Sequence, residues 1–85
     1  MPIKNPDEAI SFSLSMENVR KEIGREGRWW IKAEAYDPAN FKDVWLVVLG
    51  NGNGECGSPH QCHIHIRRDG TIMWPFKCSD GWNCK

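Results

Sequence analysis

The N-terminal part of the chain carries an apolar pattern of helical spacing. Asn5 is a favourable N-cap, and Pro6 suits the first position of a helix. Gly24 follows the last apolar residue of the pattern and suits a helix end. The pattern predicts one helix of about five turns between these residues. Its apolar stripe consists of Ala9, Phe12, Met16, Val19 and Ile23.

Residues 10–16 also allow a second interpretation. They alternate strictly between apolar residues and serines, which is typical of a strand. A shorter helix capped by Ser15 would then follow. Ile10 and Leu14 fall off the helical stripe, so the pattern leaves both interpretations open.

Two further segments predict strands. Residues 28–37 alternate, with Trp29 and Ile31 on one face and Trp30 and Tyr36 on the other, as expected of a half-buried strand. Residues 44–49 form a continuous apolar run that includes Trp45. Such a run predicts a central strand, covered on most of both faces.

Residues 62–67 and 71–76 predict a hairpin. A three-residue loop over residues 68–70, with Gly70 at positive φ, places nearly all apolar side chains on one face. This register leaves His63, His65 and Arg67 on the solvent face. Pro75 cannot donate a ladder hydrogen bond, so the second strand is predicted at a sheet edge. The predicted apolar pairs are Ile66 with Ile72, Ile64 with Trp74, and Cys62 with Phe76, which puts Trp74 in the core.

These elements predict an α+β fold in a single domain over residues 1–85. One N-terminal helix packs on a small four-stranded antiparallel sheet, and cysteines staple the C-terminal hairpin. The helix stripe and one sheet face each need a partner, and this arrangement buries both. A chain of this length has room for one modest core.

The four cysteines, Cys56, Cys62, Cys78 and Cys84, flank the hairpin and allow three interpretations. They are candidate zinc ligands, either all four together or in a mixture of cysteine and histidine, although five residues separate each sequential pair, more than the usual two to four. Two disulfides are the second interpretation, and a bond between Cys62 and Cys78 would close a loop of about 17 residues, worth roughly 3 kcal/mol. Free thiols acting as small core residues are the third.

Charge and hydropathy narrow the classes of function. The formal net charge is zero and the sequence pI is about 6.8, which disfavours a general nucleic-acid binder. No apolar stretch approaches the length of a membrane span, and no export signal is visible at the N-terminus. We therefore expect a soluble, cytoplasmic protein without a membrane partner, a setting that disfavours disulfides.

The solvent face of the hairpin holds the candidate catalytic residues. His63 and His65 project from one strand face, as a general acid/base pair would, and Arg67 lies beside them. The three residues would suit the binding or cleavage of RNA. Solvated histidines are the simpler interpretation, because no acid lies close in sequence to orient them.

A short stretch resembles HicA-type mRNA interferase toxins. Gly57-Ser58 with His60, followed by Asp69-Gly70 and Pro75-Phe76, is similar to the Gly-Ser-His, turn and Pro-Phe strand of that family. The stretch covers about 20 residues, contains an inserted Pro59, and has cysteines that the family lacks. The resemblance implies a ribonuclease in which His60 is the functional histidine.

The aromatic residues favour a different function. Five tryptophans exceed what a core of this size needs, and exposed aromatic residues commonly anchor protein partners. Trp30, Tyr36 and Trp82 are the candidate anchors, with Arg67 and Arg68 beside them. We predict a small non-enzymatic protein that occupies a protein partner, such as the inhibitors or adaptors that mobile elements encode. An RNA-binding protein or small ribonuclease toxin is the alternative.

Overall fold

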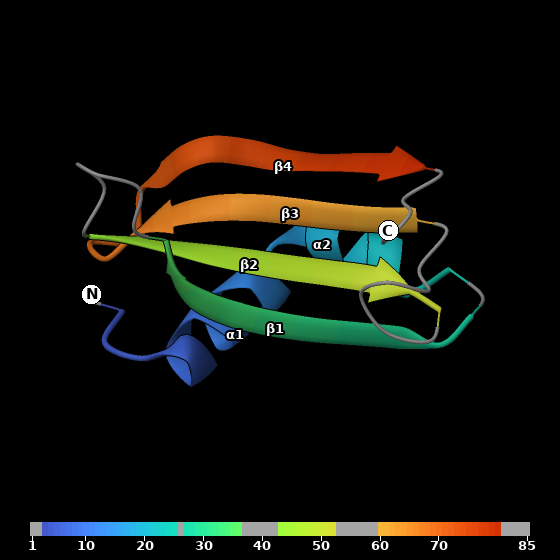
Figure 1. Ribbon diagram of the computed structural model, residues 1–85, viewed down its shortest axis with the longest axis horizontal. Helices are drawn as coiled ribbons and strands as arrows, with labels where there is room; N and C mark the ends of the chain where they lie inside the picture. Colours follow the sequence, from blue (N-terminus) through green and yellow to red (C-terminus); the bar gives the residue numbers. More distant parts are fainter. Residues whose placement is uncertain (1–2, 26, 37–42, 53–59, 81–85) are drawn as a thin grey trace.

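A computed structural model describes residues 3–25, 27–36, 43–52 and 60–80. Four strands form one antiparallel sheet in the order β1-β2-β3-β4, and both helices of the described chain lie against the same face of it (Figure 1). This confirms the predicted α+β fold, with an N-terminal helix packed on a four-stranded sheet. The elements are α1 (Pro6–Leu14), α2 (Glu17–Ile23), β1 (Trp29–Tyr36), β2 (Val44–Asn51), β3 (His60–Arg67) and β4 (Ile72–Asp80).

The start of α1 is set by its capping residues, as predicted. The Asn5 side chain accepts a hydrogen bond from the Glu8 backbone N–H at 2.9 Å, which satisfies one of the free donors of the first turn. Pro6 occupies the first helical position, where its missing N–H costs nothing. Residues 10–14 are helical, so the strand interpretation of this segment is wrong.

The helical segment is interrupted, however, and the prediction of one continuous helix is also wrong. Met16 adopts extended backbone angles between α1 and α2. The Ser15 hydroxyl donates to the Phe12 carbonyl at 2.6 Å, a local bond by which serine competes with the helix ladder. Gly24 follows α2 as its C-cap, as predicted.

The residues of the predicted apolar stripe still face the core on both sides of this break. Ala9 and Val19 are fully buried, and Phe12, Met16 and Ile23 pack against the same core. Burial of the stripe outweighs the interrupted ladder, because tertiary packing contributes most of a short helix's stability. On the sheet side, the core contains Trp45, Val47, Leu49, Cys62, Ile64 and Ile66.

The face of the sheet away from the helices is called the open face below. Strand alternation puts Trp30, Lys32, Glu34 and Tyr36 of β1 on this face. The register continues the face across Leu46 and Val48 of β2, His63, His65 and Arg67 of β3, and Trp74 and Lys77 of β4.

The turn between β3 and β4 forms as predicted. Gly70 has a φ of 92°, and its backbone N–H donates to the Arg67 carbonyl at 2.9 Å. The Arg67 N–H donates to the Thr71 carbonyl at 2.8 Å, and Ile66 lies opposite Ile72. Glycine suits this position because positive φ is strained for residues that carry a Cβ.

Beyond the turn, the predicted pairs of Ile64 with Trp74 and Cys62 with Phe76 are wrong. Two irregularities, each adding one residue to β4, place Trp74 opposite His65 and Cys78 opposite Cys62. Pro75 lies within this irregular stretch of an edge strand, as expected of a residue that cannot donate to the ladder. The first shift turns Trp74 onto the open face, where it is 42% exposed, so its predicted core position is wrong. Trp45 is buried, as predicted.

The segment before α1 packs against the core near the turn between β3 and β4. The Ile3 N–H donates to the Arg68 carbonyl at 2.6 Å, and the Trp45 indole N–H donates to the Ile3 carbonyl at 2.9 Å. The Arg68 guanidinium lies 4.9 Å from the centre of the Trp45 ring. Within the described residues, neither helix has the length and apolar character needed to cross a membrane.

Candidate functional site

A histidine and a glutamate meet between the helix layer and the sheet. His60 is the first residue of β3, and Glu22 lies near the end of α2. The His60 Nε2 and Glu22 Oε1 atoms are 2.5 Å apart, and the two side chains are only 16% and 19% exposed. Arg25 Nη1 donates to the same Glu22 oxygen at 2.7 Å. The Trp29 ring packs edge-on against the His60 ring, with 6.0 Å between ring centres.

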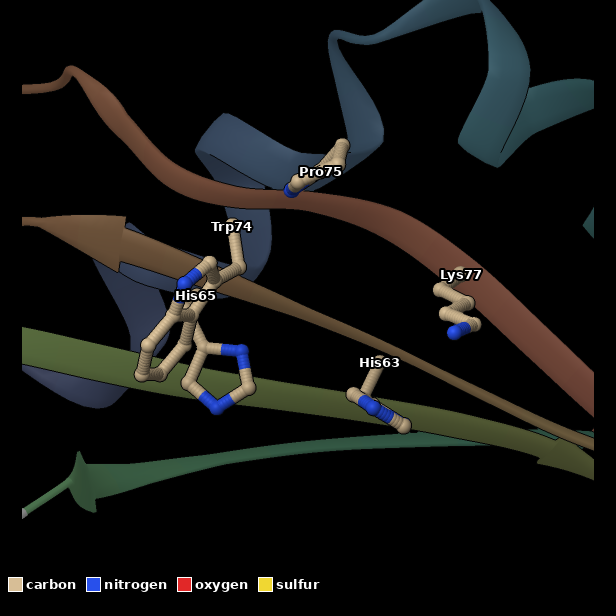
Figure 2. A pocket seen from close by; sticks show the side chains of 5 residues that line it. All are labelled: His63, His65, Trp74, Pro75 and Lys77. Carbon is tan, nitrogen blue, oxygen red and sulfur yellow. The ribbon is translucent and has the colours of Figure 1, made fainter.

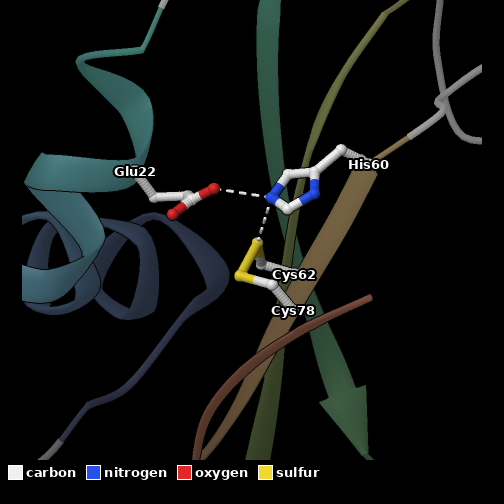
Figure 3. Close-up of side chains that lie close together, drawn as sticks. All are labelled: Glu22, His60, Cys62 and Cys78. Atoms are coloured by element: carbon white, nitrogen blue, oxygen red, sulfur yellow. Dashed lines mark hydrogen bonds and ion pairs between the residues drawn. A yellow bond between two sulfur atoms is a disulfide. The ribbon is translucent and has the colours of Figure 1, made fainter. Parts of the chain in front are cut away.

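A disulfide lies directly beside this pair. Cys62 and Cys78 are opposite each other on β3 and β4, and their Sγ atoms are 2.02 Å apart. The Cys62 Sγ is 3.5 Å from the His60 Nε2. Figure 3 shows both side chains next to Glu22 and Cys78. Cys62 is fully buried, whereas Cys78 is half-buried on the edge strand. The predicted staple is therefore present between these two cysteines.

Together, Glu22, His60, Cys62 and Cys78 form a group that could hold a metal ion. One ligand atom from each lies within 4.8 Å of the others. Two residues of the predicted four-cysteine set belong to this group, and the other two, Cys56 and Cys84, lie outside the described residues. The four-cysteine set itself therefore stays a prediction.

Sequence reasoning allowed a histidine among the ligands without singling out His60, and it missed Glu22. His60 had a usable signal, because residues two apart on a strand share a face and His60 precedes Cys62 by two. Glu22 had none, since only the packing of α2 on the sheet brings it to a histidine 38 residues away.

The predicted histidine face lies on the opposite side of β3. His63, His65, Trp74, Pro75 and Lys77 line an open depression of about 390 Å³. Figure 2 shows these side chains arising from the neighbouring strands β3 and β4. Tyr36 joins them from β1, with its ring centre 4.6 Å from that of His65 and 6.1 Å from that of Trp74. The depression is therefore bordered mainly by aromatic rings.

His65 lies at the centre of this ring cluster. Burial, and secondarily the nearby His63, holds the pKa of His65 below its ordinary value of 6.5. Its Nδ1 atom is buried and has no hydrogen-bond partner among the described residues.

As a catalytic pair, His63 and His65 lack an orienting group in the described part of the chain. Their ring centres are 5.8 Å apart and edge-to-face. The neighbours of His65 are the rings of Tyr36 and Trp74, and no ion pair to a carboxylate is formed by either histidine among the described residues. General acid/base catalysis usually relies on such an orienting partner.

The predicted binding residues are not gathered in one place. Tyr36 belongs to the aromatic cluster, and Trp30 is half-buried at the other end of β1. Arg67 is exposed on the open face, but Arg68 packs on the Trp45 ring at the turn. Trp82 lies outside the described residues. The binding role of these five residues stays a prediction.

No family model, curated protein or solved structure matches this chain. The resemblance to HicA-type toxins thus rests on the few residues quoted for it.

Proposed function

We propose that this protein acts by occupying a protein partner through its open face, without catalysing a reaction. The observation that carries the proposal is the aromatic depression around Trp74. This side chain is 42% exposed although it is large and apolar. Exposed aromatic residues bordering a depression are typical anchors of protein interfaces.

Charge supports a partner segment that combines acidic and apolar side chains. The basic residues Lys32, Arg67 and Lys77 outnumber Glu34 among the described residues of the open face. An apolar side chain would fill the depression, and an acidic neighbour would meet Lys77 at its rim.

Matched variants test the proposal. Trp74→Ala removes the proposed anchor, and Leu14→Ala removes a similarly exposed apolar side chain from α1. Proteins captured from host extract by the parent chain are compared by quantitative mass spectrometry with those captured by each variant. A direct partner should lose at least about tenfold in affinity for Trp74→Ala and keep its affinity for Leu14→Ala. Equal capture by all three proteins would overturn the proposal.

RNA is the second candidate partner, favoured by basic and aromatic residues on the same face. Single strands bind such platforms by base stacking and phosphate contacts. Gel-shift titrations with single-stranded RNA at several salt concentrations distinguish the two partners. Binding that weakens steeply with salt and is lost in Trp74→Ala would favour RNA.

If the protein is instead a ribonuclease, the parent chain should cleave RNA. The double variant His63→Ala with His65→Ala should then reduce the cleavage rate at least about a hundredfold.

We also propose zinc as the ion for the group of Glu22, His60, Cys62 and Cys78. Thiolate and imidazole are ligands that zinc prefers, and a carboxylate completes four donors. This group lies on the helix side of the sheet, whereas the proposed partner binds the open face. The two proposals therefore stand or fall separately.

A further inference from the structure

We infer that the Cys62–Cys78 disulfide gates this zinc site, so that the oxidised chain rejects zinc and the reduced chain binds it. The inference rests on the zinc proposal above and adds the condition under which the site exists. Its basis is the position of the disulfide, whose Cys62 Sγ lies 3.5 Å from a histidine that already contacts Glu22. Oxidation thus removes two of the four donors of a single group.

In the oxidised chain, only two good ligands remain. Each disulfide sulfur is bonded to its partner and carries no negative charge, and zinc binds the thiolate form of cysteine. His60 and Glu22 alone fall short of the four ligands of a structural zinc site. Their contact at 2.5 Å is then a side-chain contact between a helix and a strand.

Reduction supplies the missing donors. A dithiol reductant gives two electrons and two protons to the Cys62–Cys78 bond, which becomes two thiols while the reductant becomes a cyclic disulfide. Zinc then displaces a proton from each thiol and binds both thiolates, the neutral imidazole of His60 and the carboxylate of Glu22. Two protons are released for each zinc ion bound.

The geometry requires only small movements. Zinc lies about 2.3 Å from sulfur and about 2.0–2.2 Å from nitrogen or oxygen, so tetrahedral ligand atoms are roughly 3.3–3.8 Å apart. The four donor atoms already lie within 4.8 Å of one another. Breaking the disulfide lets the two sulfurs separate, and the His60–Glu22 contact lengthens by about 1 Å to admit the ion.

The surroundings of the group also give a metal ion access and balance the charge of the bound site. Cys78 is half-buried on an edge strand, and His60 and Glu22 are partly exposed, which gives both reductant and metal a route to the group. Two thiolates, one carboxylate and Zn²⁺ sum to one negative charge. Arg25, which already donates to Glu22, offsets that charge and orients the carboxylate.

The direct test is equilibrium dialysis of the full chain against zinc alone, followed by metal analysis. One sample is kept oxidised, and the other is reduced with a phosphine and handled without oxygen. The reduced chain should hold one zinc per chain, and the oxidised chain should bind at least about a hundredfold more weakly. Equal binding by both would overturn the gating while leaving the zinc proposal intact. No zinc in either would overturn both.

Substitutions test which residues bind the ion. Glu22→Gln preserves the shape of the side chain, and His60→Ala removes the imidazole. Each should weaken zinc binding by the reduced chain at least about tenfold, as ligand losses do. The matched controls are Glu17→Gln, an exposed position on α2, and His63→Ala, on the other face of β3. Both should stay within about twofold of the parent. Unchanged binding in Glu22→Gln and His60→Ala would exclude this ligand set.

A further double variant separates this site from a four-cysteine site. Cys56→Ser with Cys84→Ser leaves the proposed ligands untouched and should keep one zinc per reduced chain. Loss of zinc in this variant would contradict the ligand set proposed here and favour four cysteine ligands instead.

Discussion

The two faces of β3 present histidines in opposite chemical settings. His60 lies on the helix-covered face, beside a carboxylate and a sulfur atom. His65 lies five positions along the strand on the open face, against the rings of Tyr36 and Trp74. Residue type alone therefore does not indicate the chemistry of a strand histidine. The side chains that pack against each face of the sheet determine that chemistry.

The same contrast separates stability from recognition. The covered face contains the core and the disulfide that ties β4 to β3. The open face exposes Trp74 and leaves a depression beside His63 and His65. Substitutions on the covered face should therefore change unfolding, whereas those on the open face should change binding.

The largest difference in the free energy of unfolding is expected between a variant of a core residue and a variant of the exposed tryptophan. Ile64→Ala removes a fully buried side chain, and we expect it to lower the free energy of unfolding by about 2–5 kcal/mol. Trp74→Ala should cost about 1 kcal/mol or less, because its contacts are cross-strand pairs on an exposed face. Urea denaturation measures both values. Similar losses would show that the open face is part of the core.

Removal of the disulfide should have the next largest effect. Cys62→Ala with Cys78→Ala releases a loop whose ends are 16 residues apart in sequence. We expect a loss of roughly 3 kcal/mol, because the unfolded chain gains the entropy that the bond removes. The parent and the variant are compared by thermal and denaturant unfolding without reductant. An unchanged midpoint would mean that this bond does not constrain the unfolded chain.

The turn offers a smaller test of the register that defines the two faces. Gly70→Ala places a Cβ at a φ of 92°, and we expect a loss of about 1 kcal/mol or more in the free energy of unfolding. Lys77→Ala, an exposed change on the same hairpin, serves as the control and should stay within about 0.5 kcal/mol of the parent. If Gly70→Ala is equally harmless, the bulged turn is wrong.

The pH dependence of His65 gives the smallest expected effect. Burial lowers its pKa, so the unfolded chain takes up the proton first as pH falls. The stability due to neutral His65 is complete above the unfolded value of 6.5 and declines as pH falls toward the lower folded pKa. His63→Ala should raise the pKa of His65, because it removes the secondary cause. Titration of the His65 ring protons by NMR measures this, and a shift in the opposite direction would contradict it.

The sequence was sufficient to predict the layers of this fold. The alternation of β1, the apolar run of β2, the Asn5–Pro6 start and the Gly70 turn are local signals, and each predicted the element that forms. The break at Met16 and the shifts near Pro75 were missed, because periodicity does not show where a ladder is interrupted. The first shift places Trp74 on the open face, and after the second shift Cys78 lies on the helix-covered face again.

The candidate metal group was only half predictable for a related reason. The predicted hairpin put Cys62 and Cys78 at its flanks, and a bond between them was one of three interpretations of the cysteines. Glu22 approaches His60 only because α2 packs on the sheet, and no local pattern encodes that contact. Tertiary packing, rather than residue spacing, therefore defines the donor set.

The most direct test of the two-face account is an NMR zinc titration that resolves the three histidine rings. In the reduced chain, zinc should change the ring resonances of His60 and leave those of His63 and His65 unchanged. In the oxidised chain, the same zinc additions should leave all three unchanged. Zinc-dependent changes at His63 or His65, or changes at His60 that do not depend on the disulfide, would contradict the account.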